Sequence, residues 1–233
     1  MKLSWRMGSL GVLVLIFSGL SAVEGYAQQE TLRIVEDETV LSVVVQTTGV
    51  ASRFAPDHFI HAGRYHVDLT LDPGRPEDAS FEARVWAPDL VVNDRDLRDE
   101  LEARLLELGI LDDPYDEMSE EDREDVWTAM MMEGQLHASE HPWIEVEAVD
   151  IRRTDDEDFP WIVTAALIAR GTRVEAPVHG RMEREGEAIR IEAFGEFHFT
   201  DLGIEPYSAF LGAVRNRDAF HVYLTLLAEP EGC

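Results

Sequence analysis

The chain has 233 residues, of which 45% are hydrophobic, so it is long enough to bury one sizeable core. Its 47 acidic residues outnumber its 20 basic ones and give a formal net charge of −27. A surface of that charge repels phosphate backbones and anionic membrane faces, which excludes nucleic acid as a partner and favours neutral or cationic molecules.

The amino end has the pattern of a secretory signal peptide. Lys2 and Arg6 precede an uncharged run over residues 7–23, and Gly25 and Ala27 are small residues at the positions that a signal peptidase reads, so cleavage is expected after Ala27. The run is shorter than the roughly 20 residues that span a bilayer, so an uncleaved anchor is the less favoured alternative. We predict a signal peptide over residues 1–27 and one mature domain over residues 28–233, periplasmic or secreted, with no stable membrane insertion after cleavage.

The cysteine content bears on covalent partners. Cys233 is the only cysteine, so no disulfide can form within the chain. Its thiol is either free or links two copies, which leaves a homodimer open.

The first half of the mature chain has the period of two that marks half-buried strands. We expect strands over residues 31–36, 39–47, 58–72 and 80–92, with a turn at Asp37 and Glu38 and a loop over residues 49–57. Strict alternation over residues 58–72 would put Phe59, Tyr65 and Val67 on one face.

The period then changes to that of a helix. Leu97, Leu101, Leu105 and Leu108 share one helical face, and Gly109 is placed to end it. A second helix is expected after Ser119, with its end near residue 134. We predict a helical insertion over about residues 93–140, which serves as packing, as a lid over a ligand entrance, or as an acidic surface for a partner.

Strands resume after the insertion. Alternating segments over residues 143–152, 159–170, 172–184, 188–200 and 218–229 are joined by short turns, and Gly171 lies at the turn of the central hairpin. Eight or nine strands with short connections and one helical excursion predict an all-β fold, an antiparallel eight-stranded β-barrel with a helical insertion.

Several motifs resemble those of the YceI family of lipocalin-like periplasmic proteins. They are His-Pro-Trp-Ile at residues 141–144, Leu-Ile-Ala-Arg-Gly-Thr-Arg at 167–173, Asp-Leu-Gly-Ile-Glu-Pro-Tyr-Ser at 201–208, the closing segment 218–226, and residues 52–63 with His58 and His61. Leu202 departs from the phenylalanine usual in the family, and Ile168 and Ala169 depart from its leucine and threonine. The insertion is also longer and more acidic than the family pattern.

The resemblance implies a lipocalin-like barrel that binds a polyisoprenoid chain or a quinone-like lipid in its interior. The alternating faces then give the side chains expected to contact this apolar lipid: Phe59, Tyr65, Val67, Val85, Ile144, Val146, Ile162, Ile189, Ile191, Phe197, Phe220 and Val222. The alternative function is a stress or interaction protein whose barrel is filled by its own side chains and which binds a partner through the acidic insertion.

No motif indicates catalysis. The sequence has no Gly-x-Ser-x-Gly nucleophile turn, no phosphate-binding glycine loop and no Cys-x-x-Cys pair, so we predict no catalytic residues and no enzyme activity.

Histidines offer one candidate metal site. His137 and His141 are four residues apart, with Glu133 four before, a spacing that would put three ligands on one side of a helix. Gly134 weakens such a helix, and Pro142 disfavours helical geometry at the residue before it. We therefore predict no metal ligands and no resident cofactor beyond a bound isoprenoid or quinone lipid.

Overall fold

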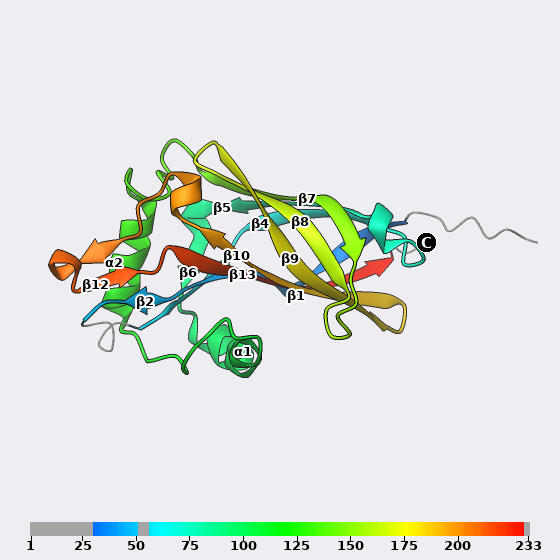
Figure 1. Ribbon diagram of the computed structural model, residues 1–233, viewed down its shortest axis with the longest axis horizontal. Coiled ribbons are helices and arrows are strands. Elements are labelled where there is room, and N and C mark those ends of the chain that lie inside the picture. The colour runs from blue at the N-terminus through cyan, green and yellow to red at the C-terminus, as the bar shows by residue number, and fades with distance from the viewer. Residues whose placement is uncertain (1–29, 51–55, 231–233) are drawn as a thin grey trace, which may run out of the picture.

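A computed structural model describes residues 30–50 and 56–230 of the chain, and β-strands dominate this part (Figure 1). The predicted signal peptide and Cys233 lie outside the described residues. No helix in the described ranges is both long enough and apolar enough to cross a membrane. The principal strands are β1 (Glu30–Val45), β3 (His58–Ala62), β4 (Tyr65–Leu71), β5 (Ser80–Trp86), β6 (Leu90–Val92), β7 (Trp143–Arg153), β8 (Trp161–Ala169), β9 (Thr172–Glu185), β10 (Ala188–His198) and β13 (Ala219–Pro230).

Antiparallel pairing joins these strands into a closed ring. The order around it is β1, β4, β5, β7, β8, β9, β10 and β13, and β13 pairs back onto β1. The predicted eight-stranded antiparallel barrel is therefore confirmed. Closure leaves none of these eight strands as a full-length free edge.

Two of the predicted strands are bent into two parts. β3 and β4 both run antiparallel to β1 and are separated at Gly63 and Arg64, while β6 continues β5 and pairs with β3. The amide nitrogen of Gly63 donates to the carbonyl oxygen of Asp89 at 2.9 Å, and a Cβ at residue 63 would lie 2.5 Å from that oxygen. Glycine is therefore required where the strand bends.

The opening of the chain differs from the prediction. Residues 31–36 and 39–47 were expected to form two strands with a turn between them, whereas β1 is one strand. Val35 lies opposite Leu227 and Val40 opposite Thr225, so residues 36–39 form a bulge against Leu226. The acidic run at Glu36, Asp37 and Glu38 is exposed on this bulge and does not reverse the chain.

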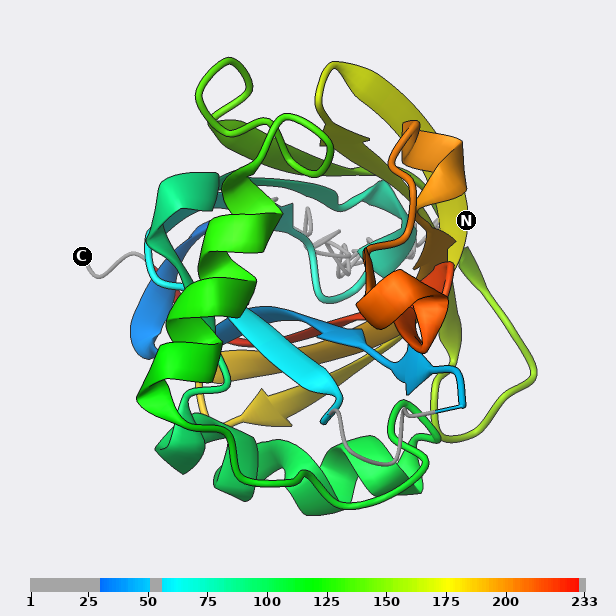
Figure 2. The same cartoon turned by 90° about the vertical axis from the view of Figure 1, so that its left-hand side faces the viewer.

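The helical insertion contains α1 (Arg95–Glu107) and α2 (Glu120–Met131). The side chains of Asp94 and Ser119 cap them, accepting from the amides of Leu97 and Asp122 respectively. α1 packs on the outer face of the barrel, where Leu101 and Leu105 bury against its wall. α2 instead lies across one end of the barrel, as Figure 2 shows. A small sheet of β2 (Thr47–Thr48), β11 (Ser208–Ala209) and β12 (Val214–Asn216) lies at the same end.

A buried ionic cluster fastens α1 to the wall. Glu192 of β10 has a side chain only 7% exposed, and it accepts from Arg104 of α1 at 2.8 and 2.9 Å. Arg181 of β9 donates to it at 2.6 Å and the hydroxyl of Tyr223 at 3.0 Å. Burial raises the pKa of Glu192, but the hydrogen bonds from Arg104 and Tyr223 outweigh burial and hold this pKa below its usual value.

Candidate ligand-binding cavity

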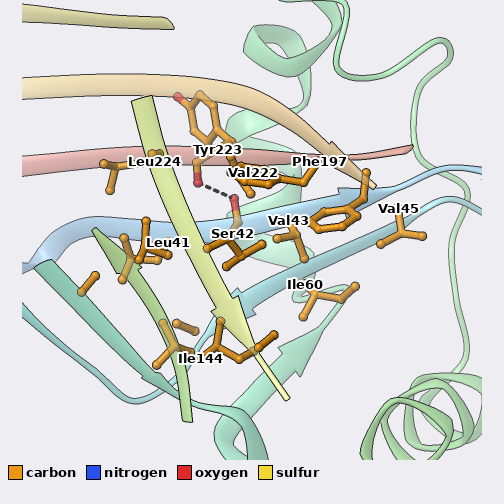
Figure 3. Close-up of a pocket in the computed structure, with 18 of the residues that line it drawn as sticks. Leu41, Ser42, Val43, Val45, Ile60, Ile144, Phe197, Val222, Tyr223 and Leu224 are labelled. Carbon is orange, nitrogen blue, oxygen red and sulfur yellow. Dashed lines mark hydrogen bonds between the residues drawn. The ribbon is translucent and has the colours of Figure 1, made fainter. Parts of the chain in front are cut away.

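A long cavity of about 810 Å³ occupies the interior of the barrel. Figure 3 shows part of its lining, with Leu41, Val43, Val45, Ile60, Ile144, Phe197, Val222 and Leu224 extending from several strands. Its volume is in the range of sites that enclose a lipid or drug-sized molecule, roughly 300–1,000 Å³. The barrel is therefore not filled by its own side chains.

The register of the strands explains how the lining is built. Residues directly opposite each other in an antiparallel pair point to the same face. Val85 lies opposite Ile144 and Phe197 opposite Phe220, and all four line the cavity. Apolar side chains from neighbouring strands thus form a continuous inner surface.

Small residues keep the interior open. An eight-stranded barrel has just enough room for its own side chains when these are large. Here Ala165, Ala169, Ala193 and Gly180 line the cavity at positions where bulkier side chains would fill it. Gly195 instead allows β10 to pack closely against β9, because a Cβ there would lie 2.8 Å from a methyl carbon of Val178 on that strand.

One end of the barrel is closed by a separate apolar cluster. Ile189, Leu226 and Ala228 are buried there with Leu32, and Leu69 and Leu71 belong to both the cluster and the cavity lining. Leu226 and Ala228 have no exposed surface. The cavity borders this cluster and extends toward the opposite end.

The opposite end lies under α2. Met118, Val126 and Met130 turn their apolar side chains toward the cavity, and Gln135 and Leu136 follow from the turn after the helix. Carboxylates of the same region, Glu117, Asp122 and Asp125, also border this end. The entrance is thus apolar inside and acidic at its rim.

Positive charge is scarce in the lining. Among the described lining residues, His58 and Arg181 are the groups that could carry it. Burial lowers the pKa of His58 to about 4, so its imidazole is neutral at pH 7. Arg181 is paired with Glu192 and with Glu183, 3.1 Å away. Neither group is a free cation for an anionic ligand head.

The twelve side chains expected to contact a ligand divide into two sets. Those that line the cavity are Val85, Ile144, Val146, Ile191, Phe197, Phe220 and Val222. Ligand contact by these residues stays a prediction, since the cavity shows only where a ligand would fit.

Five predicted side chains do not line the cavity. Phe59 is fully buried beneath α1, and Ile162 lies on the opposite face of β8 from the cavity lining. Ile189 belongs to the cluster that closes the barrel. Tyr65 and Val67 lie in β4, and the hydroxyl of Tyr65 donates to the carbonyl oxygen of Glu36 in the bulge of β1 at 3.1 Å.

Most of the lining was not predicted from the sequence. It includes residues of β1, namely Leu41, Val43 and Val45, and residues of the inner face of β8, namely Trp161, Val163, Ala165, Leu167 and Ala169. Both faces of β8 are apolar, so alternation gave no sign of which face points inward. Its small residues do not separate the faces either, because Ala165 lines the cavity and Ala166 does not.

Groups of the kind that ligate metals also gather outside the cavity. His137, Glu140 and His141 lie together on the turn that follows α2, and each offers one ligand atom within 4.8 Å of the other two. Glu133, the third ligand expected from helical spacing, does not belong to this group.

No family model and no curated protein matches the sequence. Solved structures do match. The crystal structure of BcnA from Burkholderia cenocepacia aligns with a TM-score of 0.59 at 10% identity, covering 84% of this chain and 99% of that one. A Campylobacter jejuni YCEI protein aligns with a TM-score of 0.48 at 8% identity, covering 75% and 85%. A polyisoprenoid binding domain from Saccharophagus degradans, implicated in plant cell wall breakdown, aligns with a TM-score of 0.47 at 8% identity, covering 87% and 99%.

At 10% identity, the likeness to BcnA establishes a shared fold. The predicted antiparallel barrel is confirmed by the closed ring of strands itself. YCEI structures are among the matches.

Proposed function

We propose that this lipocalin-like barrel with YceI-type motifs is a periplasmic binding protein that sequesters one long apolar lipid and carries out no reaction on it. The observation that carries the proposal is the cavity of about 810 Å³ inside the closed ring of strands. A polyisoprenoid or quinone-like tail suits this space because its lining is apolar over most of its length.

Burial of the tail supplies the affinity. Each methylene removed from water contributes about 0.8 kcal/mol, so an isoprene unit contributes on the order of 4 kcal/mol before ordering costs. Part of that gain is lost when the flexible tail is ordered. Tight binding with slow release follows, which suits storage or transfer of a molecule that is insoluble in water.

The charge of the lining selects the head group. His58 is neutral, Arg181 is already paired, and carboxylates border the entrance. An anionic diphosphate head would meet repulsion without a compensating cation, whereas a hydroxyl or a quinone carbonyl would not. We therefore propose a lipid with an uncharged head.

The direct test is to extract the purified protein with organic solvent and to identify what is released by mass spectrometry. We expect one chain-like lipid at close to one molecule per protein. A shift in the emission of Trp161, which lines the cavity and would lose contact with water, would then report rebinding of a prenol and of a prenyl diphosphate of equal length. The prenol should bind at least about tenfold more tightly. Protein free of lipid that also binds neither compound would refute the proposal.

The same test addresses the alternative function. A stress or interaction protein would yield no lipid and would leave the emission of Trp161 unchanged. Its expected feature was a barrel filled by its own side chains, and the open cavity favours the lipid-binding proposal over it.

A further inference from the structure

We infer that His137, Glu140 and His141 form a binding site for a divalent transition metal of the zinc type, outside the lipid cavity. The three side chains come from one short turn between α2 and β7, and their nearest ligand atoms all lie within 4.8 Å of one another. Two imidazoles and one carboxylate are a donor set that zinc accepts, with water as a fourth ligand.

The backbone explains why these residues converge although they are not on a helix. α2 ends at Met131, and His137 has a left-handed conformation with φ of 50°. Its carbonyl oxygen then accepts from the amides of both Glu140 and His141, at 3.0 and 2.9 Å. This tight turn brings the side chains of residues 137 and 141 to the same side of the turn, although the residues are not on a helix. Non-glycine residues seldom adopt such a conformation, and it is often retained where function requires it.

The turn is held in place on several sides. The amide of His137 donates to the carbonyl oxygen of Met132 at 2.9 Å, which ties it to the end of α2. The carbonyl oxygen of Pro142 accepts from the amide of Ala87 at 2.9 Å, which ties its other end to the barrel. The ligand side chains therefore start from a fixed backbone, and such preorganisation favours binding.

The distances require only a small adjustment. Ligands about 2.0–2.1 Å from a tetrahedral ion lie about 3.3 Å from one another. Separations of up to 4.8 Å thus need side-chain rotations that move the ligand atoms by roughly 1 Å. The net charge of −27 adds a general attraction for cations.

A simple ion pair does not account for the whole arrangement. The Nε2 atom of His137 lies 3.8 Å from a carboxylate oxygen of Glu140, which would explain these two residues alone. The ring centroids of His137 and His141 lie 5.8 Å apart in a T-shaped contact, so a second imidazole adjoins the pair. Two imidazoles beside one carboxylate are better explained by a shared ion.

His198 provides a contrast within the same molecule. Its Nε2 atom lies 3.7 Å from Glu196 and its Nδ1 atom 3.8 Å from Asp201. The two carboxylates adjoin different ring nitrogens, so they do not converge with the imidazole on one ion. A histidine with acidic neighbours but no convergent site is thus available as a control.

Metal binding would stiffen the region next to the cavity entrance. Gln135 and Leu136, which line the cavity, directly precede the site, and Gln135 donates to the carbonyl oxygen of Glu205 at 3.0 Å. An ion across residues 137–141 would hold the end of α2 against β7. Binding would not require a lipid in the cavity.

The test is titration of the lipid-extracted, full-length protein with zinc chloride by calorimetry, and with cobalt chloride by visible spectroscopy. We expect one zinc ion per chain and the visible absorption of tetrahedral cobalt. His137→Asn, which tolerates the left-handed conformation, and His141→Gln should each weaken zinc affinity at least about tenfold. His198→Gln should leave it within about twofold, a change too small for loss of a ligand.

A second measurement uses the unaltered protein, so it does not depend on the folding of variants. Zinc should slow hydrogen exchange at the amides of residues 136–141 and leave exchange in β9 unchanged. Absence of cobalt absorption, no change in exchange at the turn, or equal loss of affinity in His198→Gln would each overturn the inference. Failure of the lipid proposal would leave these results unaffected.

Discussion

Substitution of Ile191 by tryptophan tests whether the cavity is the binding site. Ile191 lines the cavity from β10, with Met182 opposite it on β9 and Leu226 opposite it on β13. It lies next to the cluster that closes the barrel. A larger side chain here should shorten the cavity from its closed end without touching the entrance.

The size of the effect can be estimated from the atoms displaced. Tryptophan has about six more heavy atoms than isoleucine, which is close to one isoprene unit, worth at most about 4 kcal/mol by burial. At about 0.3 kcal/mol per atom, the efficiency usual for ligands of this size, the loss is closer to 2 kcal/mol. We expect affinity for a prenol to fall by at least about tenfold, which corresponds to about 1.4 kcal/mol.

The assay compares lipid recovered by extraction and prenol affinity in the wild type, in Ile191→Trp and in Ile162→Trp. Ile162 is the matched control because it lies on the outer face of β8, away from the cavity lining. Thermal unfolding of all three proteins shows whether each is folded. Equal lipid content in Ile191→Trp and the wild type, or an equal loss in the outward control, would refute the assignment of the cavity as the site.

Three further substitutions test the fold around the site. Glu192→Gln should cost about 2 kcal/mol in urea unfolding at pH 7, a value between those of buried and exposed ion pairs because both arginine partners are partly exposed. Because the pKa of Glu192 is lower in the folded protein than its value of 4.5 in the unfolded chain, this stabilisation is full above pH 4.5 and is lost as the pH falls through the folded-state pKa. The difference in unfolding free energy between wild type and Glu192→Gln should therefore shrink at pH 4 and below. A difference that stays constant with pH would contradict the pKa argument. Asn93→Ala should cost about 3 kcal/mol, because residue 93 is left-handed and its side-chain oxygen accepts from the buried amide of Phe59 at 2.6 Å; a loss below about 1 kcal/mol would show that water replaces this bond. Gly195→Ala should lower the melting temperature by several degrees, because the added Cβ would lie 2.9 Å from the carbonyl oxygen of Pro177. Gly134→Ala adds a carbon in open space and should leave the melting temperature nearly unchanged. Similar shifts in the two variants would refute the packing argument.

The strand pattern was predictable because alternation is a local property of the sequence. β9, β10 and β13 lie close to the expected ranges, and the inward residues Ile191, Phe197 and Phe220 were identified from their polar neighbours. Arg190, which separates apolar residues on β10, marks the outer face unambiguously. Where each strand has one face exposed to solvent, the alternation in the sequence determines which side chains point inward.

The prediction was wrong where a local irregularity shifts the alternation. Ile60 and Ala62 of β3 line the cavity, whereas in β4 the lining residues are Leu69 and Leu71. The inward side chains therefore have even numbers in β3 and odd numbers in β4. The bend at Gly63 causes that shift. Counting by twos from Leu71 through the bend therefore placed Phe59 inside, although it lies beneath α1. A glycine within an alternating segment indicates that a bulge or bend can interrupt the alternation there. It does not indicate which residues point inward beyond the bend.

The positions of the two helices depend on contacts between residues far apart in the chain. Both helices were expected from local spacing, with Ser119 at the start of the second, whereas the cap of the first at Asp94 was not predicted. α1 lies against the outer wall because Arg104 reaches Glu192, 88 residues further on, and nothing near Arg104 in the sequence indicates that partner. α2 has the less regular apolar stripe, yet it is the helix that turns Val126 and Met130 toward the open end of the barrel. If a long lipid enters beneath α2, this helix must move or its side chains must rotate to admit it. The end of α2 that is joined to the proposed metal site is therefore where entry of the lipid would be most sensitive to bound zinc.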